Sequence, residues 1–248
     1  MKILAFNGSP RMENGATDVL LDKFLEGARA AGAQTEKIYL KRKKINNCIS
    51  CFTCWTKTPG TCVSKDDMPE ILEKLRAADI WVFATPVYCD TMTSYTKTLI
   101  ERMLPFLMPF MEEQDGRTMH PLRYLEERGK HKMAIISVCG FPERANFEPL
   151  SHTFQKFSIN FHAPVVAEIF MPAGSVLLSE RSRRHFTKFL EAVSDAGREI
   201  VMKGNLSDKT GEILGKGPAI QHAFYRFLVN RWWKGKIKDS ANADVERK

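Results

Sequence analysis

The sequence lacks the features that would place the chain in a membrane, in a secretory pathway or among disordered proteins. No apolar run approaches the roughly 18 residues that a membrane-spanning helix needs. The apolar start of the chain, residues 1–6, is too short for a signal peptide. Because 44% of the 248 residues are apolar, the chain can bury a core, which excludes disorder as its main state. We therefore expect a cytoplasmic, enzyme-sized domain without a membrane span.

Acidic residues are absent from residues 37–65, which carry seven lysines and arginines. Residues 203–248 hold ten basic and five acidic residues, within a formal net charge of +8. Such blocks attract anions, and charge alone does not choose between nucleic acid, a phosphorylated cofactor and an anionic metal centre. A nucleic-acid function is not expected, because no recognisable nucleic-acid-binding module accompanies the charge.

Buried strands and amphipathic helices alternate along the first two hundred residues. This alternation is typical of a doubly wound α/β fold, with five parallel strands in the order 2-1-3-4-5. The predicted strands span residues 1–7, 34–40, 80–84, 133–138 and 165–170. Apolar residues at helical spacing predict helices that begin near residues 17, 67, 93, 147 and 182.

Two segments fall outside this alternation. Residues 105–129 contain several prolines and glycines, which predict an irregular insertion or lid. Beyond residue 204, a basic tail carries aromatic residues that we expect to pack on this chain or on a partner subunit rather than to stack on bases. These aromatic residues are Phe224, Tyr225, Phe227, Trp232 and Trp233. The expected organisation is a domain over 1–204, an extension over 205–248, and a homodimer or homotetramer.

The loop between the first predicted strand and the first predicted helix has the chemistry of an anion site. It lies at the carboxyl end of a strand, where doubly wound sheets bind ligands, and it runs into a helix N-terminus with free N–H groups. The chain has neither a Walker A motif nor G-x-G-x-x-G, so a monophosphate fits better than a triphosphate. Ser9 and Thr17 supply hydroxyl groups, Arg11 supplies a positive charge, and Gly15 lets the backbone approach a ligand closely. An ordinary polar turn with a helix cap is the alternative.

Two further loops should lie at the same sheet edge. Residues 85–90 follow the third predicted strand, and residues 139–143 follow the fourth. Pro86, Val87 and Tyr88 would form an apolar ledge with exposed backbone amides, which suits a flat polar ring system. Each loop alone could be a plain turn, but three loops that converge on one crevice favour a ligand site.

These loops together resemble the NAD(P)H-dependent FMN reductases of the flavodoxin-like superfamily, and most of all their iron–sulfur flavoprotein branch. The resemblance covers residues 1–200 by order of elements and rests on Gly8-Ser9-Pro10-Arg11, Gly15-Ala16-Thr17, Thr85-Pro86-Val87-Tyr88, Lys97 and Glu101-Arg102. It implies a flavodoxin-like fold, FMN as cofactor and NAD(P)H as electron donor. It also implies phosphate contacts from Ser9, Arg11, Gly15, Ala16 and Thr17, and ring contacts from Pro86, Val87, Tyr88, Cys89, Cys139 and Gly140. Relatives often show Gly-Asn-Thr where this chain has Asn14-Gly15-Ala16-Thr17, so at Ala16 only the N–H can serve.

Four of the six cysteines form a compact motif, Cys48-x2-Cys51-x2-Cys54-x7-Cys62. In a cytoplasmic chain, such clustering indicates metal or redox chemistry more than structural disulfides. Zinc sites usually pair two C-x2-C knuckles over a longer separation, whereas triplets spaced by two residues are typical of iron–sulfur ligation. The resemblance also implies a [4Fe–4S] cluster on these four residues, which nearby lysines would stabilise. Zinc, and free or disulfide-forming thiols, are the alternatives.

The expected function is that of an FMN-dependent NAD(P)H oxidoreductase. Hydride would pass from the nicotinamide to FMN, and electrons would continue through the cluster to a quinone, a small molecule or a redox protein. No side chain need act as an acid or a base, because the cofactor carries the chemistry. A flavin and iron–sulfur electron carrier without a nicotinamide site, and an FMN reductase without a cluster, are the alternatives.

Overall fold

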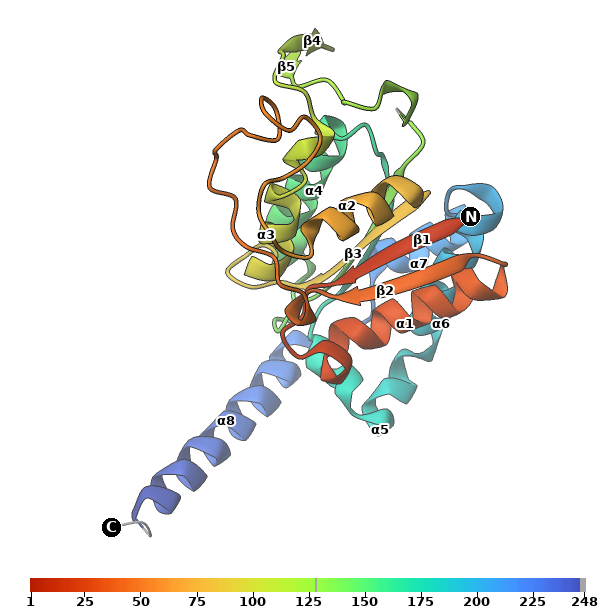
Figure 1. Ribbon diagram of the computed structural model, residues 1–248. Coiled ribbons are helices and arrows are strands. Elements are labelled where there is room, and N and C mark those ends of the chain that lie inside the picture. The colour runs from red at the N-terminus through yellow and green to blue at the C-terminus, as the bar shows by residue number, and fades with distance from the viewer. Residues whose placement is uncertain (128, 246–248) are drawn as a thin grey trace.

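The computed structural model describes residues 1–127 and 129–245. Its centre is a five-stranded parallel sheet in the order β2-β1-β3-β6-β7 (Figure 1). The strands are β1 (Lys2–Asn7), β2 (Gln34–Tyr39), β3 (Ile80–Pro86), β6 (Lys132–Val138) and β7 (Val165–Met171). Because β6 and β7 are the fourth and fifth strands of this sheet along the chain, the predicted flavodoxin-like order is confirmed.

Helices cover both faces of the sheet, which is why its central strand is apolar on both sides. All seven residues of β3 are buried. Trp81 and Phe83 pack with α2 (Met68–Ala77), α3 (Ser94–Glu101) and α4 (Glu148–Asn160). Their neighbours Ile80 and Val82 point to the other face and pack with α1 (Ala16–Ala30) and α6 (Thr187–Lys203).

The last helix of the predicted domain begins later than expected. The prediction of one helix starting near residue 182 was wrong at its N-terminal end. The chain first forms the short helix α5 (Glu180–Arg183) and a 3₁₀ turn (Arg184–Phe186), and α6 starts at Thr187. Neither short element fully buries a residue, and Phe186 is only partly buried against the core, so little packing holds this stretch in one continuous helix.

The insertion packs against the cysteine-rich loop. It contains the hairpin β4 (Glu112–Gln114) and β5 (Arg117–Met119), with 3₁₀ turns on either side, so it is irregular as predicted. Arg123 of the insertion donates hydrogen bonds to the carbonyl oxygens of Pro105, at 3.0 Å, and Cys54, at 3.3 Å. Trp55 donates to the carbonyl of Leu104 at 3.2 Å. We call residues 47–65 together with 105–127 the cysteine lobe.

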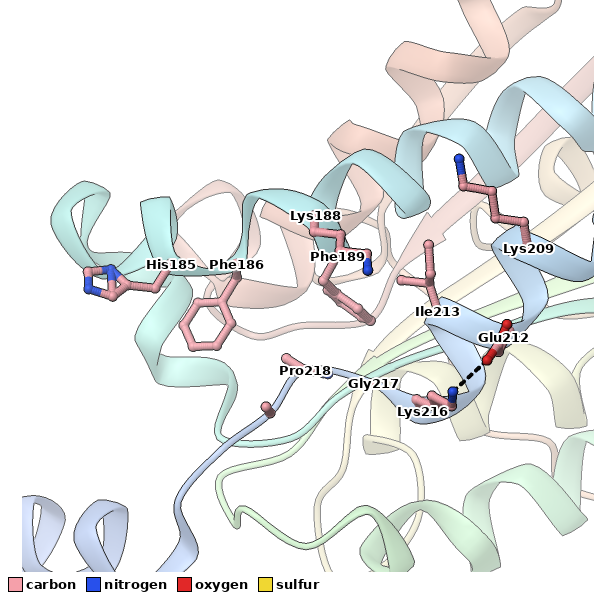
Figure 2. Close-up of a pocket in the computed structure, with 11 residues that line it drawn as sticks. His185, Phe186, Lys188, Phe189, Lys209, Glu212, Ile213, Lys216, Gly217 and Pro218 are labelled. Atoms are coloured by element: carbon pink, nitrogen blue, oxygen red, sulfur yellow. Dashed lines mark hydrogen bonds and ion pairs between the residues drawn. The ribbon is translucent and has the colours of Figure 1, made fainter.

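The C-terminal extension has two parts. Helix α7 (Asp208–Lys216) packs against α6 and β7 and buries Leu214. Phe189 of α6 and Ile213 of α7 line a pocket beside this contact (Figure 2). Helix α8 (His222–Val245) projects away from the body of the molecule (Figure 1). Trp232 and Trp233 stay 55% exposed on α8, so packing of these two on a partner remains a prediction. Among the described helices, none is both long and apolar enough to cross a bilayer.

Helices α1 and α6 approach one another through two glycines. A Cβ at Gly27 would lie 1.8 Å from the carbonyl oxygen of Ser194, and one at Gly197 would lie 2.0 Å from that of Phe24. We expect Gly197→Ala to lower the free energy of unfolding by about 1–3 kcal/mol, because the two backbones must separate. Gly211→Ala in α7 is the control, since its Cβ would meet no atom within 4 Å and should stabilise by up to about 1 kcal/mol. Denaturant unfolding measures both variants, and equal effects would contradict the close approach.

Candidate functional site

The first loop folds back on itself at the carboxyl end of β1. Ser9 and Thr17 are buried, and a Cβ on Gly15 would lie 2.8 Å from the Ser9 hydroxyl. Gly15 is the N-cap of α1 and makes no side-chain cap hydrogen bond. The N–H of Asp18 donates to the carbonyl of Gly15 at 3.0 Å, and the N–H groups of Ala16 and Thr17 are the ones that an anion can bind. Ala16 is buried in this first turn and Arg11 is exposed beside it.

A network of buried and part-buried hydrogen bonds joins this loop to β1, α1 and β2. Asn7 donates to Asp18 at 2.8 Å, and its own amide oxygen accepts the backbone N–H of Ser9 at 2.8 Å. Lys37 on β2 donates to Asp18 at 2.9 Å. Burial alone would lower the pKa of Lys37, but hydrogen bonds, led by the one to Asp22, outweigh burial and raise it. No local pattern in the sequence indicates this network, because its members lie on three separate elements, β1, α1 and β2.

The second loop forms a tight turn that exposes an aromatic ring. Tyr88 and Thr91 exchange backbone hydrogen bonds of 2.8 and 3.2 Å, and the two residues between them, Cys89 and Asp90, have φ values of 47° and 65°. Two successive positive φ values define a type I′ turn, which is strained without glycine. Exposure rises along this segment: Pro86, the last residue of β3, is buried, Val87 is half-buried, and Tyr88, where the turn begins, is 49% exposed.

The third loop follows β6 and lies beside the second. The N–H of Val87 donates to the carbonyl of Val138 at 2.8 Å, which fixes the two loops in register. Cys139 is buried, and burial raises the pKa of its thiol. Gly140 is exposed, and its carbonyl accepts a hydrogen bond of 2.9 Å from the hydroxyl of Tyr225 on α8. Sequence reasoning missed Tyr225 as a contact of this loop.

The first and second loops are also joined. The Thr93 hydroxyl, at the N-cap of α3, donates to the carbonyl of Gly8 at 2.8 Å, and the N–H of Gly8 donates to the carbonyl of Ala84 at 2.7 Å. All three loops therefore meet at the carboxyl ends of β1, β3 and β6. The residues predicted to bind the phosphate or the ring lie on these loops or, for Ala16, Thr17 and Pro86, in the adjoining ends of α1 and β3. Their role in binding remains a prediction.

The four motif cysteines line one cavity of about 380 Å³ in the cysteine lobe. Cys54 is buried and Cys51 is exposed. Burial raises the pKa of Cys54, and the neighbouring Cys62, Cys51 and Cys48 raise it further. The pKa of Cys51 is lowered by hydrogen bonds from the hydroxyl and backbone of Thr53. Each of the other three thiols therefore affects the ionisation of Cys54.

Within the described residues, no three His, Cys, Asp or Glu side chains are grouped tightly enough to hold a single metal ion. A tetrahedral zinc site needs four such ligands around one ion. An iron–sulfur cluster holds four thiolates around a larger volume. Four thiols that line one cavity match the donor chemistry of both kinds of centre.

A buried guanidinium lies at the wall of this cavity. Arg102 is 2% exposed and donates to Asp66 at 2.6 Å and to the sulfur of Cys62 at 3.3 Å. Asp66 also accepts the backbone N–H groups of Asn46 and Met68, at 2.9 and 3.1 Å. Arg102 was noticed in the sequence only as part of the resemblance, and its place beside the cysteines follows from the structure alone.

The stability of the lobe should depend on the ionisation of Asp66. Burial alone would raise the pKa of Asp66, but the Arg102 guanidinium and the backbone donors lower it from 3.8 to about 2. The folded state therefore gains about 2 kcal/mol above pH 4, which is lost as the pH falls from about 4 to about 2. We expect Asp66→Asn to be less stable at pH 7, with a difference that shrinks over this range. Denaturant unfolding at several pH values checks this, and a difference that does not change with pH would contradict it.

Comparisons with known proteins identify the family of the chain. The family model for NADPH-dependent FMN reductase matches residues 1–176. An iron–sulfur flavoprotein of Archaeoglobus fulgidus is 40% identical over 106 residues, which cover 43% of this chain and 47% of that protein. An iron–sulfur flavoprotein of Methanocaldococcus jannaschii is 37% identical over 110 residues, 44% of this chain and 55% of its own. The matches thus span about half the length of these curated relatives.

Solved structures show the same fold at low sequence identity. An azoreductase from Bacillus anthracis superposes with a TM-score of 0.60 and 14% identity over 80% of this chain and 99% of its own. An NAD(P)H:quinone oxidoreductase from Methanothermobacter marburgensis superposes with a TM-score of 0.57 and 15% identity over 81% of this chain and 98% of its own. Because the family model covers well over half of the sequence, the chain belongs to the NADPH-dependent FMN reductase family.

Proposed function

We propose that the protein is an FMN-dependent NAD(P)H oxidoreductase that also carries an iron–sulfur centre on its four motif cysteines. The observation that carries the first part is the convergence of three loops at the carboxyl edge of the sheet, in a chain that belongs to an FMN reductase family. FMN, when bound, would accept hydride from a nicotinamide and pass on one or two electrons.

The first loop would bind the phosphate group. The N–H groups of Ala16 and Thr17 in the first turn of α1 would donate to it, and the hydroxyls of Ser9 and Thr17 would add donors. Arg11 supplies a positive charge from the exposed side. The Asn7–Asp18–Lys37 network keeps the loop in shape before a ligand binds, which reduces the entropy lost on binding.

The second and third loops would orient the flavin ring. Pro86, Val87 and Tyr88 offer an apolar surface with backbone amides, and Cys139 and Gly140 lie beside them. The buried Cys139 thiol, with its raised pKa, stays protonated at neutral pH and serves as a small packing group rather than a nucleophile. These residues bind and orient, and none of them needs to transfer a proton.

Cys48, Cys51, Cys54 and Cys62 would hold a [4Fe–4S] cluster, which supplies one-electron transfer. Support comes from the thiol-lined cavity and from the relatives described as iron–sulfur flavoproteins. The electron acceptor would then be a quinone, a small molecule or a redox protein that reaches the cysteine lobe.

Analysis of protein purified without oxygen tests the proposal. We expect flavin absorption bands, a broad shoulder from the cluster, about four irons per chain and steady oxidation of NAD(P)H with an artificial acceptor. Flavin without iron would remove the cluster and leave an FMN reductase. Bound flavin without NAD(P)H oxidation would make the protein an electron carrier. Failure to bind FMN would overturn the central claim.

A further inference from the structure

We infer that Arg102 is a positioning residue that raises the reduction potential of the centre held by the cysteine lobe. This inference rests on the proposed function, because it requires a cluster on the motif cysteines. It starts from one contact, the 3.3 Å hydrogen bond from the Arg102 guanidinium to the sulfur of Cys62. The other guanidinium nitrogen donates to the carbonyl of Asn46 and to Asp66, each at 2.6 Å.

Asp66 aims the guanidinium at the sulfur. Its carboxylate is held from behind by the backbone N–H groups of Asn46 and Met68 and by the Ser64 hydroxyl, at 2.9, 3.1 and 3.0 Å. Both nitrogens of the Arg102 fork reach this carboxylate, at 2.6 and 3.2 Å. A planar fork fixed at two points has little rotational freedom, so the remaining N–H keeps its direction toward Cys62.

Four basic side chains of the acid-free stretch, residues 37–65, have partners outside the cysteine lobe. Lys37 binds Asp18 and Asp22, Lys41 binds the carbonyl of Pro10, and Arg42 pairs with Glu13. Lys43 lies 3.7 Å from Glu70. These four basic side chains are therefore engaged away from the cysteines. Among the hydrogen bonds of the described residues, the one to a motif sulfur from a charged side chain comes from Arg102.

The direction of the effect follows from charge. Reduction of a four-thiolate cluster adds one negative charge to an already anionic centre. A positive group that donates an N–H to one of its sulfurs stabilises the reduced form more than the oxidised form. Burial strengthens this preference, since the Arg102 and Asp66 side chains are 2% and 0% exposed and water screens them little. Arg102 therefore makes the centre easier to reduce.

The test compares Arg102→Lys with Arg123→Lys in the iron-loaded protein. Lysine keeps the charge but loses the fork, so the hydrogen bond to Cys62 should be lost while Asp66 keeps a partner. Arg123 is the matched control, because it holds the same lobe through carbonyl oxygens and, among the described residues, has no hydrogen bond to a sulfur. We expect Arg102→Lys to retain iron and to show a more negative midpoint potential in a dye-mediated titration. The Arg123→Lys midpoint should equal that of the unaltered protein, and an unshifted Arg102→Lys midpoint would overturn the inference.

A second measurement covers the case in which Arg102→Lys loses its iron. Unaltered protein, grown with ¹⁵N-labelled arginine and reduced with dithionite, should show a ¹⁵N coupling to the cluster in pulsed EPR. Absence of this coupling would refute the contact. Iron-free protein that still binds FMN would instead refute the cluster itself, and the role of Arg102 would fall with it while the flavin proposal stands.

Discussion

Cys51→Ala is expected to remove iron from the protein and to leave its flavin content unchanged. Cys51 is an exposed member of the cysteine set that lines the 380 Å³ cavity, so the loss of its thiolate leaves the centre one ligand short. The lobe should keep its fold, because Trp55 and Arg123 anchor it through backbone carbonyls rather than through Cys51. The flavin loops belong to other elements, at the carboxyl ends of β1, β3 and β6.

The matched control is Cys89→Ala. Cys89 is also an exposed free thiol, but it lies in the turn after β3 and outside the cysteine lobe. We expect this variant to keep about four irons per chain. Iron and flavin are measured on the same anaerobic preparations. Unchanged iron in Cys51→Ala would contradict the ligand assignment, and equal iron losses in both variants would indicate general oxidation rather than loss of a ligand.

The sheet could be predicted because its signals are local. Strand β3 is apolar at every position, and a continuously buried strand has that pattern wherever it occurs. The start of α6 was misplaced for a related reason. Residues 182–185 are polar and Phe186 is only partly buried against the core, so the apolar spacing did not mark where the helix begins.

The contacts that shape the candidate sites could not be predicted in this way. Asp18 meets Lys37 across two elements, Arg102 meets Asp66 across 36 residues, and Tyr225 meets Gly140 across 85. Each pair joins side chains whose approach depends on tertiary packing and not on spacing along the chain. The motif predicted which cysteines gather, whereas the structure was needed to find the cation beside them.

The aromatic tail shows another limit of sequence reasoning. Its composition indicates packing, but α8 reaches its own chain mainly through its first turns, where Tyr225 contacts Gly140 and Arg226 pairs with Glu143 at 3.0 Å. The tryptophans farther along remain exposed. Isolated helices are only marginally stable in water, so a partner for α8 is still expected, and its identity remains a prediction.

Arg11→Ala is expected to weaken FMN binding by about tenfold to a hundredfold and to leave riboflavin binding nearly unchanged. A charge-assisted hydrogen bond to a phosphate contributes about 1.5–3 kcal/mol to binding. Riboflavin has no phosphate, so it does not make this hydrogen bond and loses nothing when Arg11 is replaced. Arg11 is exposed at the edge of the first loop, and its backbone N–H donates to the Ser9 hydroxyl at 3.2 Å. Because alanine keeps that backbone donor, the loop should stay folded when the side chain is removed.

Arg29→Ala is the control for this variant. Arg29 lies in the last turn of α1, at the opposite end of the helix from the loop, and donates a hydrogen bond to Thr35. Titration of apoprotein with each flavin, followed by fluorescence quenching, gives the two dissociation constants. Added salt should reduce the FMN advantage of the unaltered protein and have little effect in Arg11→Ala, because screening acts on the charge that the variant lacks. Equal losses for FMN and riboflavin would show that Arg11 shapes the loop rather than binds phosphate, and the phosphate contact would then belong to the α1 N–H groups with Ser9 and Thr17.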